Sequence, residues 1–125
     1  MQIAILTFEG FNEIDSFVAL GILGRVRKRD WHVSIASPSK RVVSMNGVAI
    51  EARLSLEEAR GADAVIVGSG VTTRDIVANP DLLASIELDP AKQLVGAQCS
   101  GALLLAKLGL RVDHFGNSTG LLADI

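Results

Sequence analysis

Residues 93–107, QLVGAQCSGALLLAK, decide the fold, because an apolar strand-like run turns into a helix-like run around the only cysteine of the chain. The pattern predicts a strand over 93–97 and a helix over 100–107, which places Cys99 at a strand-to-helix corner. A side chain at such a corner projects from the end of a sheet, where the free N–H groups and dipole of the following helix favour a thiolate over a thiol. The corner therefore offers nucleophilic chemistry without a metal.

The sequence around this corner approximates a nucleophile elbow. Residues 97–101, AQCSG, match the G-x-S-x-G pattern with cysteine as the nucleophile and Ala97 in place of the first glycine. Gly101 allows the strand and the helix to pack closely. The alternative is a buried, inert cysteine that packs as a small hydrophobic residue.

The composition predicts one domain over residues 1–125. Of the 125 residues, 49% are hydrophobic, which is enough apolar material to bury a sizeable core. The net charge is −2, and the one basic cluster, at residues 25–29, has no interleaved aromatic side chains. We therefore expect neither nucleic-acid nor membrane binding, and we place the cluster in the last turns of a helix, where cations complement the helix dipole.

The N-terminus and the cysteine count bear on location and cofactors. Residues 1–8 have no basic segment, and their apolar run is too short for a signal peptide or a membrane span, so a cytoplasmic location is expected. A single cysteine excludes an intramolecular disulfide, and no His, Cys, Asp or Glu residues have the spacing of zinc ligands. We therefore expect no metal and no cofactor.

Strand-like and helix-like runs alternate along the chain, which is typical of an α/β fold with a mainly parallel sheet. Ser55 and Glu58 fit a capping box that opens a short helix. The first helix is expected to bury a face formed by Phe17, Val18, Ile22 and Val26. The strands are expected at 2–7, 31–37, 63–67 and 93–97, and further helices at 15–28, 72–78, 80–86 and 100–107.

A β-hairpin is expected to interrupt this alternation near residues 41–52. Two strand-like runs, 41–45 and 48–52, flank the dipeptide Asn46-Gly47. This dipeptide favours the positive φ angles of a tight type I′ turn, so an antiparallel insert is predicted.

Three loops are expected to converge on one crevice, because they all follow the carboxyl ends of predicted parallel strands. They come after the first strand, after Val67 and after Gln98. The N–H groups of residues 68–71, GSGV, and the N–H of Ser100 are candidates to face an oxyanion opposite Cys99. The alternative is an ordinary strand-exit turn, and a phosphate loop is disfavoured because no Gly-Lys-Ser/Thr follows.

Asp15 has two possible roles. It is placed to be the N-cap of the first helix, which is a structural role. If its carboxyl points into the crevice instead, the protonated form donates a hydrogen bond to the Cys99 thiolate and acts as a general acid.

These features together resemble the DJ-1/PfpI superfamily, also called ThiJ/PfpI or class I glutamine amidotransferase-like. The resemblance covers residues 1–109 and rests on the first strand with its acidic helix start, the Gly68-Ser69-Gly70 turn and the Cys99 elbow. It implies a flavodoxin-like three-layer sandwich and a homodimer. It also implies a reactive Cys99 that is hydrogen-bonded by Asp15, with oxyanion N–H groups from Gly70 and Val71.

The resemblance is strongest to members like isocyanide hydratase, in which an Asp is used and a Thr follows the cysteine. Ser100 keeps that hydroxyl. Protease-like and amidase-like members place a histidine after the cysteine or later in the chain. Here His114 is the only later histidine, and it lies in a segment without a clear pattern, whereas His32 belongs to the second strand. We interpret both histidines as outside the site.

Family domains continue well past the elbow helix, and residues 111–125 do not resemble that continuation. The domain is therefore expected to be C-terminally truncated relative to the family, with a sheet edge and apolar helix faces exposed. The predicted function is a cysteine-dependent hydratase or hydrolase-like enzyme, in which the thiolate attacks a small electrophilic carbon, such as an isocyanide, to give a formamide. The alternatives are a redox-sensing or ligand-binding module without enzyme activity, and an inactive truncated relative.

Overall fold

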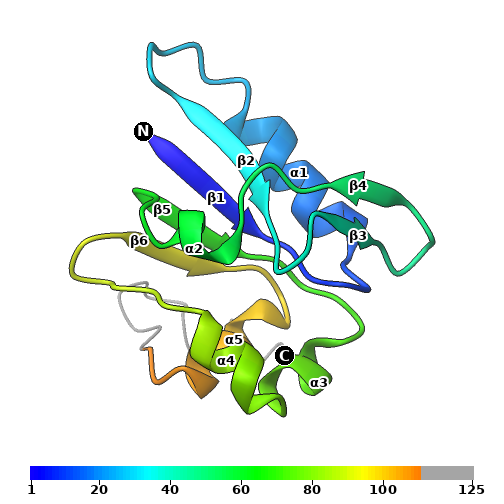
Figure 1. Ribbon diagram of the computed structural model, residues 1–125. Coiled ribbons are helices and arrows are strands. Elements are labelled where there is room, and N and C mark those ends of the chain that lie inside the picture. The colour runs from blue at the N-terminus through cyan, green and yellow to red at the C-terminus, as the bar shows by residue number, and fades with distance from the viewer. Residues whose placement is uncertain (111–125) are drawn as a thin grey trace.

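A four-stranded parallel sheet forms the centre of the molecule (Figure 1). The computed structural model describes residues 1–110. The strands are β1 (Gln2–Leu6), β2 (His32–Ala36), β5 (Ala64–Val67) and β6 (Leu94–Ala97), and they lie in the order β2-β1-β5-β6. The predicted α/β architecture is confirmed, and all four carboxyl ends lie at one edge of the sheet.

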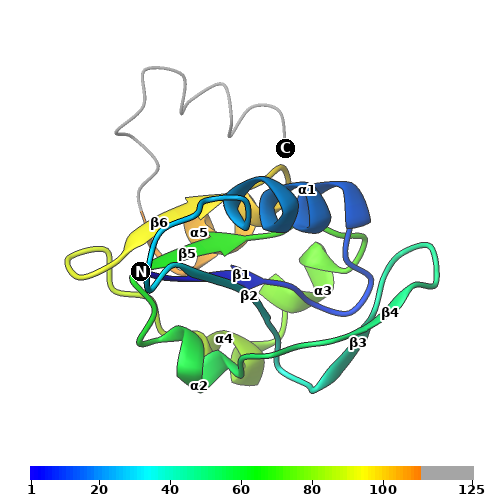
Figure 2. The same cartoon turned by 90° about the horizontal axis from the view of Figure 1, so that it is seen from above.

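Helices cover both faces of this sheet. Figure 2 shows α1 (Glu13–Leu23) on one face, with α2 (Leu56–Ala59), α3 (Thr73–Val77) and α4 (Pro80–Ser85) on the other. Helix α5 (Gly101–Lys107) packs into the same core as α3 and α4. Alternate residues of β1 serve the two layers: Ala4 and Leu6 face this larger core, whereas Ile5 packs under α1. The three-layer sandwich is therefore confirmed.

The expected β-hairpin is present, but its turn differs from the prediction. Strands β3 (Arg41–Val43) and β4 (Ala49–Glu51) pair antiparallel. The type I′ turn is wrong, because Gly47 has a φ of +87° whereas Asn46 has no positive φ. Gly47 N–H donates to the Ser44 carbonyl at 3.1 Å, so the loop over residues 45–47 ends on a left-handed glycine.

Helix α1 begins and ends earlier than predicted. Its N-cap is Asn12, whose side chain accepts a hydrogen bond from the Ile14 N–H at 2.9 Å. Asp15 therefore lies within the first turn, and its predicted role as the N-cap is wrong. The helix ends at Leu23, where the carbonyl accepts a hydrogen bond from the Trp31 indole at 2.9 Å. The basic cluster at 25–29 follows the helix, so the prediction that it lies in the last turns is also wrong.

The buried face of α1 also differs from the prediction. Ser16 and Ala19 are buried, whereas Val18 and Ile22 are 49% and 62% exposed. Small side chains face the sheet because the helix lies close to it: Ser16 Oγ is 3.3 Å from Thr7 Oγ1. Val18 and Ile22 face solvent as a result, whereas Leu20 packs against the cluster of Ile5, Ala19 and Ile35.

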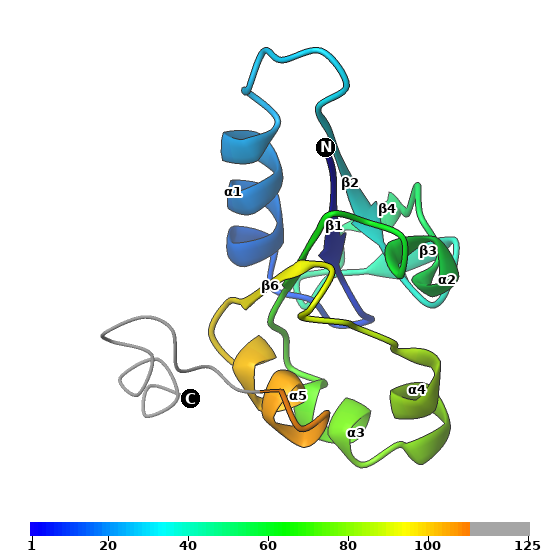
Figure 3. The same ribbon diagram turned by 90° about the vertical axis from the view of Figure 1, so that its left-hand side faces the viewer.

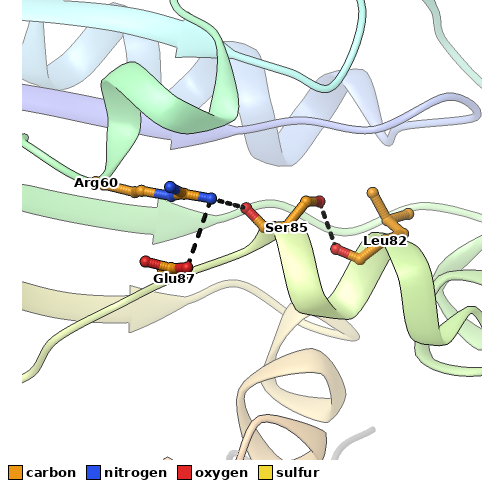
Figure 4. Close-up of polar contacts among 4 residues, drawn as sticks. All are labelled: Arg60, Leu82, Ser85 and Glu87. Atoms are coloured by element: carbon orange, nitrogen blue, oxygen red, sulfur yellow. Dashed lines mark hydrogen bonds and ion pairs between the residues drawn. The ribbon is translucent and has the colours of Figure 1, made fainter.

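Local capping fixes the short helix α2 as predicted. Ser55 and Glu58 form both hydrogen bonds of a capping box. The C-cap residue, Arg60, then reaches the end of α4, where its guanidinium lies 3.3 Å from the Ser85 carbonyl and 3.7 Å from the Glu87 carboxylate (Figure 4). This exposed ion pair contributes little to stability. It shows that the end of α2 lies next to the end of α4.

Gln93, immediately before β6, connects three parts of the chain. It is 7% exposed, and its amide nitrogen donates to the carbonyls of Ala59, Arg60 and Ala62 at 3.2, 3.2 and 2.7 Å. Its amide oxygen accepts a hydrogen bond from the Asp89 N–H at 3.0 Å. One side chain therefore satisfies the polar groups between α2 and β5 and fixes the start of β6 against them.

The structure describes one of the two histidines that the sequence places outside the site. His32 is exposed at the amino end of β2, which is the edge of the sheet opposite the three loops. His114 and the segment 111–125 lie outside the described residues. Within residues 1–110, no helix has the length and apolar character needed to cross a membrane.

We expect Gly101→Ala to lower the free energy of unfolding by about 2 kcal/mol, because overpacking against rigid groups is destabilising. A Cβ at this position would lie 2.5 Å from the Val67 carbonyl oxygen. The matched control is Gly21→Ala in α1, where a Cβ would meet nothing within 4 Å. That control should gain roughly 0.5–1 kcal/mol from helix propensity. Chemical denaturation of both variants tests this, and equal stabilities would contradict the packing argument.

Candidate functional site

Cys99 lies at the predicted corner between β6 and α5 and has an unusual backbone conformation. Its φ is +48°, in the left-handed region that residues other than glycine rarely adopt. The residue is exposed, which excludes the alternative of a buried cysteine in the core. Strained backbone of this kind is found where the surrounding structure holds a functional side chain in place.

Two glycines let the elbow and the turn after β5 come together. A Cβ on Gly101 would lie 2.5 Å from the Val67 carbonyl oxygen, so α5 begins directly against the end of β5. A Cβ on Gly70 would lie 2.6 Å from the Gly10 carbonyl oxygen, so the turn also touches the loop after β1. All three loops that were expected to converge therefore meet at this point.

Ser100 faces the glycine turn. Its hydroxyl lies 2.9 Å from that of Thr73, and the Gly70 N–H donates to it at 3.5 Å, which is a long hydrogen bond. The Ser100 N–H has no hydrogen-bond acceptor within residues 1–110. The Ser100 N–H is thus available to a ligand oxygen or to another group that carries developing negative charge, whereas the Gly70 N–H is engaged, over a long distance, by the Ser100 hydroxyl.

Val71 is placed differently from Gly70. Its N–H donates to the Gly10 carbonyl at 3.1 Å, as part of the contact between the turn and the loop after β1. Its side chain is 66% exposed. The Val71 N–H is therefore already engaged, and Val71 contributes an apolar side chain to the site rather than a free donor.

Asp15 lies between the glycine turn and the residue before Cys99. Its carboxylate accepts a hydrogen bond from the Ser69 hydroxyl, and its main-chain carbonyl accepts one from the Gln98 side-chain amide at 3.0 Å. Within the described residues, no hydrogen bond joins the Asp15 carboxyl to the Cys99 sulfur. The structure therefore brings Asp15 to the elbow but directs its carboxylate toward Ser69.

Sequence reasoning missed the roles of Ser69 and Gln98. They lie 54 and 83 residues from Asp15 in the chain, so no local spacing pattern links them to it. The Gln98 amide oxygen is buried and has no hydrogen-bond partner among residues 1–110. The only available signal was the position of each residue, inside the glycine turn and directly before the cysteine.

A second carboxylate, Glu13, is engaged by the hairpin. The backbone N–H of Glu13 itself has the largest effect and lowers the pKa of its carboxyl group. Desolvation opposes this shift, and hydrogen bonds with Ser44 and Asn46 lower the pKa further. The Asn46 amide donates to the Glu13 carboxylate at 3.0 Å. Glu13 is therefore held as a carboxylate that connects the hairpin to α1.

A groove of about 480 Å³ lies beside the elbow, between α3 and α5. This volume suits a small molecule. Among the described residues that line the groove, Arg74 is the one that carries a charge. No group of three or more His, Cys, Asp or Glu side chains in residues 1–110 is placed to hold a metal ion. The lining residues are Gly70, Val71, Thr73, Arg74, Ser100, Leu103 and Ala106.

Comparison with known proteins assigns the family. The model of the DJ-1/PfpI family matches residues 1–114. The chain belongs to the DJ-1/PfpI family. No curated protein matches the sequence significantly.

Solved structures of DJ-1/PfpI proteins share the fold. A THiJ/PfpI family protein from Pseudomonas syringae superposes with a TM-score of 0.76 at 23% identity, over 89% of this chain and 47% of that one. Drosophila melanogaster DJ-1beta superposes with a TM-score of 0.68 at 23% identity, over 87% of this chain and 60% of that one. A mutant of a DJ-1 superfamily protein from Salmonella typhimurium superposes with a TM-score of 0.69 at 28% identity, over 87% of this chain and 61% of that one. The chain therefore spans about half to three fifths of the length of these relatives.

The left-handed backbone at Cys99 predicts a measurable difference between two substitutions that both remove the thiol. Cys99→Gly should be about 1 kcal/mol more stable than Cys99→Ala, because glycine adopts a positive φ without a steric penalty. Urea denaturation of the two variants measures this difference. If Cys99→Ala is as stable as Cys99→Gly, the corner is not strained as described.

Proposed function

We propose that this chain is a cysteine-dependent enzyme of the hydratase or hydrolase type that acts on a small electrophilic carbon, such as that of an isocyanide. The observation that carries the proposal is the exposed Cys99 on a left-handed strand-to-helix corner. A groove suited to a small molecule is lined by Ser100, the residue that follows Cys99. The Ser100 N–H supplies a donor for negative charge that develops during the reaction, and the Gly70 N–H adds a second donor when it leaves its long hydrogen bond to the Ser100 hydroxyl.

The proposed reaction has two steps with Cys99 as the nucleophile. The thiolate sulfur forms a bond to the isocyanide carbon, and the same carbon takes a proton from the Asp15 carboxyl, which gives a thioimidate on the enzyme. Water then adds to this carbon, the carbon–sulfur bond breaks, and a formamide leaves. The thiol returns its proton to Asp15, so the sum is isocyanide plus water to formamide. For the first step, the Asp15 carboxyl must turn from Ser69 toward the sulfur.

Two substitutions test this reaction. Cys99→Ala should abolish formamide formation, and Asp15→Asn should lower it by about a hundredfold or more, because a positioned general acid contributes that much. Formamide is followed by NMR with an aryl isocyanide as substrate. Arg27→Gln serves as the control, since residue 27 is exposed between α1 and β2, away from the elbow. Full turnover by Cys99→Ala would exclude the mechanism.

A redox-sensing role is the second candidate function. It is favoured by the exposure of the Cys99 residue and by the Asp15 carboxylate, which is bonded to Ser69 and not to the sulfur. An accessible thiolate is oxidised in steps through sulfenic to sulfinic acid. Peroxide treatment followed by intact-mass measurement separates the candidates: oxidation confined to Cys99, without turnover of any electrophile, supports the sensor. A protein that does neither is an inactive relative.

We also infer that the chain forms a homodimer through the outer face of α1. Ile14, Val18 and Ile22 are 72%, 49% and 62% exposed, and their spacing of four residues aligns them along one side of the helix. Such a continuous apolar strip is typical of a surface that packs against another protein. The chain's single cysteine is compatible with a reducing compartment, and we propose that it works in the cytoplasm.

Val18→Asp should convert the dimer to a monomer, because a charge would be buried in the apolar contact. Light scattering coupled to gel filtration measures the mass. Val71→Asp is the matched control, since Val71 is also exposed but lies on the turn before α3. A monomeric wild-type protein, or a dimer that survives Val18→Asp, would contradict this interface.

A further inference from the structure

Helix α3 separates two grooves at the carboxyl end of the sheet and presents opposite charges to them. Arg74 lines the groove beside the elbow, whereas the next residue, Asp75, lines a second groove of about 300 Å³ together with Glu9. Consecutive residues on a helix point about 100° apart, so the two charges face different spaces. The groove that Ser100 lines is therefore cationic, and the second groove is acidic.

Arg74 places a cation on the wall of the elbow groove. The residue is exposed, and within residues 1–110 its guanidinium forms no ion pair and no hydrogen bond. The ion pair that the described part of the chain does contain joins Arg60 to Glu87, at the far side of α4. A guanidinium without an internal partner is available to bind an external anion.

The remaining wall residues favour a small ligand with an apolar part. Val71 on the turn before α3 and Leu103 and Ala106 on α5 supply apolar side chains, and the Thr73 and Ser100 hydroxyls supply polar atoms. Figure 3 shows α3 beside α5, with the elbow at the start of α5. A molecule in this groove thus lies next to Ser100, the residue that follows the nucleophile.

We propose that Arg74 binds a carboxylate on the substrate, so that this enzyme acts on small electrophiles that carry a negative charge. The proposal rests on the role of Cys99 proposed above, and it names the substrate class for the same site. An arginine guanidinium matches a carboxylate with two parallel hydrogen bonds, which gives orientation as well as affinity. The apolar groove wall then receives the part of the molecule between the carboxylate and the electrophilic carbon.

Two alkylating reagents of nearly the same size test the charge preference directly. Iodoacetate carries a carboxylate, and iodoacetamide is its neutral analogue. With either reagent the Cys99 sulfur forms a bond to the methylene carbon, and iodide leaves with the electrons of the carbon–iodine bond. The rate ratio of iodoacetate to iodoacetamide therefore measures the local preference for an anion and cancels differences in thiol reactivity.

We expect Arg74→Gln to lower this ratio by about threefold to tenfold, since a local cation raises the rate of encounter with an anion. Arg27→Gln removes the same charge away from the elbow and should leave the ratio unchanged. Arg74→Lys keeps the charge and should retain most of the ratio. An unchanged ratio in Arg74→Gln would overturn the assignment, and so would an equal fall in Arg27→Gln.

A second measurement needs no variant and guards against a variant that fails to fold. In the wild-type protein, added salt should slow alkylation by iodoacetate and leave iodoacetamide unaffected, because salt screens an exposed cation. Equal salt dependence for both reagents would count against Arg74. If the ratio behaves as expected but no electrophile is turned over, the anion site stands and the proposed enzyme activity fails, so the two results are distinguishable.

Discussion

The candidate site depends on direct backbone contact between segments that follow three parallel strands. A side chain at Gly101 or Gly70 would occupy the space that carbonyl oxygens of Val67 and Gly10 fill. The absence of these two side chains lets α5 start against β5 and lets the turn after β5 rest on the loop after β1. This close contact holds Cys99 at its positive φ, because the chain must reverse direction at once on leaving β6.

The same contact brings Asp15 to two polar partners. Its carboxylate accepts a hydrogen bond from the Ser69 hydroxyl, while its carbonyl accepts one from the side-chain amide of Gln98, one residue before Cys99. The helix start is thus fixed relative to the elbow, and the mechanism proposed above requires the carboxyl group to turn from Ser69 toward the sulfur. A chain with glycine in place of Ser69 would lack this competing donor, so the serine is a feature by which this site differs from a simple acid–thiol pair.

Local patterns predicted the fold well, and long-range contacts explain the errors. The capping box at Ser55 and the corner at Cys99 depend on neighbouring residues, and both were recognised from the sequence. The predicted buried face of α1 was wrong because the helix packs closely on the sheet through the small side chains of Ser16 and Ala19. The periodicity of apolar residues does not reveal how closely a helix approaches a sheet. The site was predicted as a set of loops, but its polar partners lie far apart in the chain. The position of Arg74 on the wall of the elbow groove depends on how α3 packs against α5. The spacing of residues along the chain does not predict that packing.

Gln93 shows that the residue suited to a buried position can depend on how many hydrogen-bond donors its side chain offers as well as on its volume. Its amide nitrogen donates to carbonyls at the end of α2 and in the connection to β5, and its oxygen accepts a hydrogen bond from the main chain before β6. Glutamate has nearly the same shape, but a carboxylate oxygen would replace the amide nitrogen. That oxygen can only accept hydrogen bonds, and it would face three carbonyl oxygens, which are also acceptors. Conversion of this one amide to an acid, by mutation or by slow deamidation, would therefore turn an attractive contact into a repulsive one without changing the packing around it.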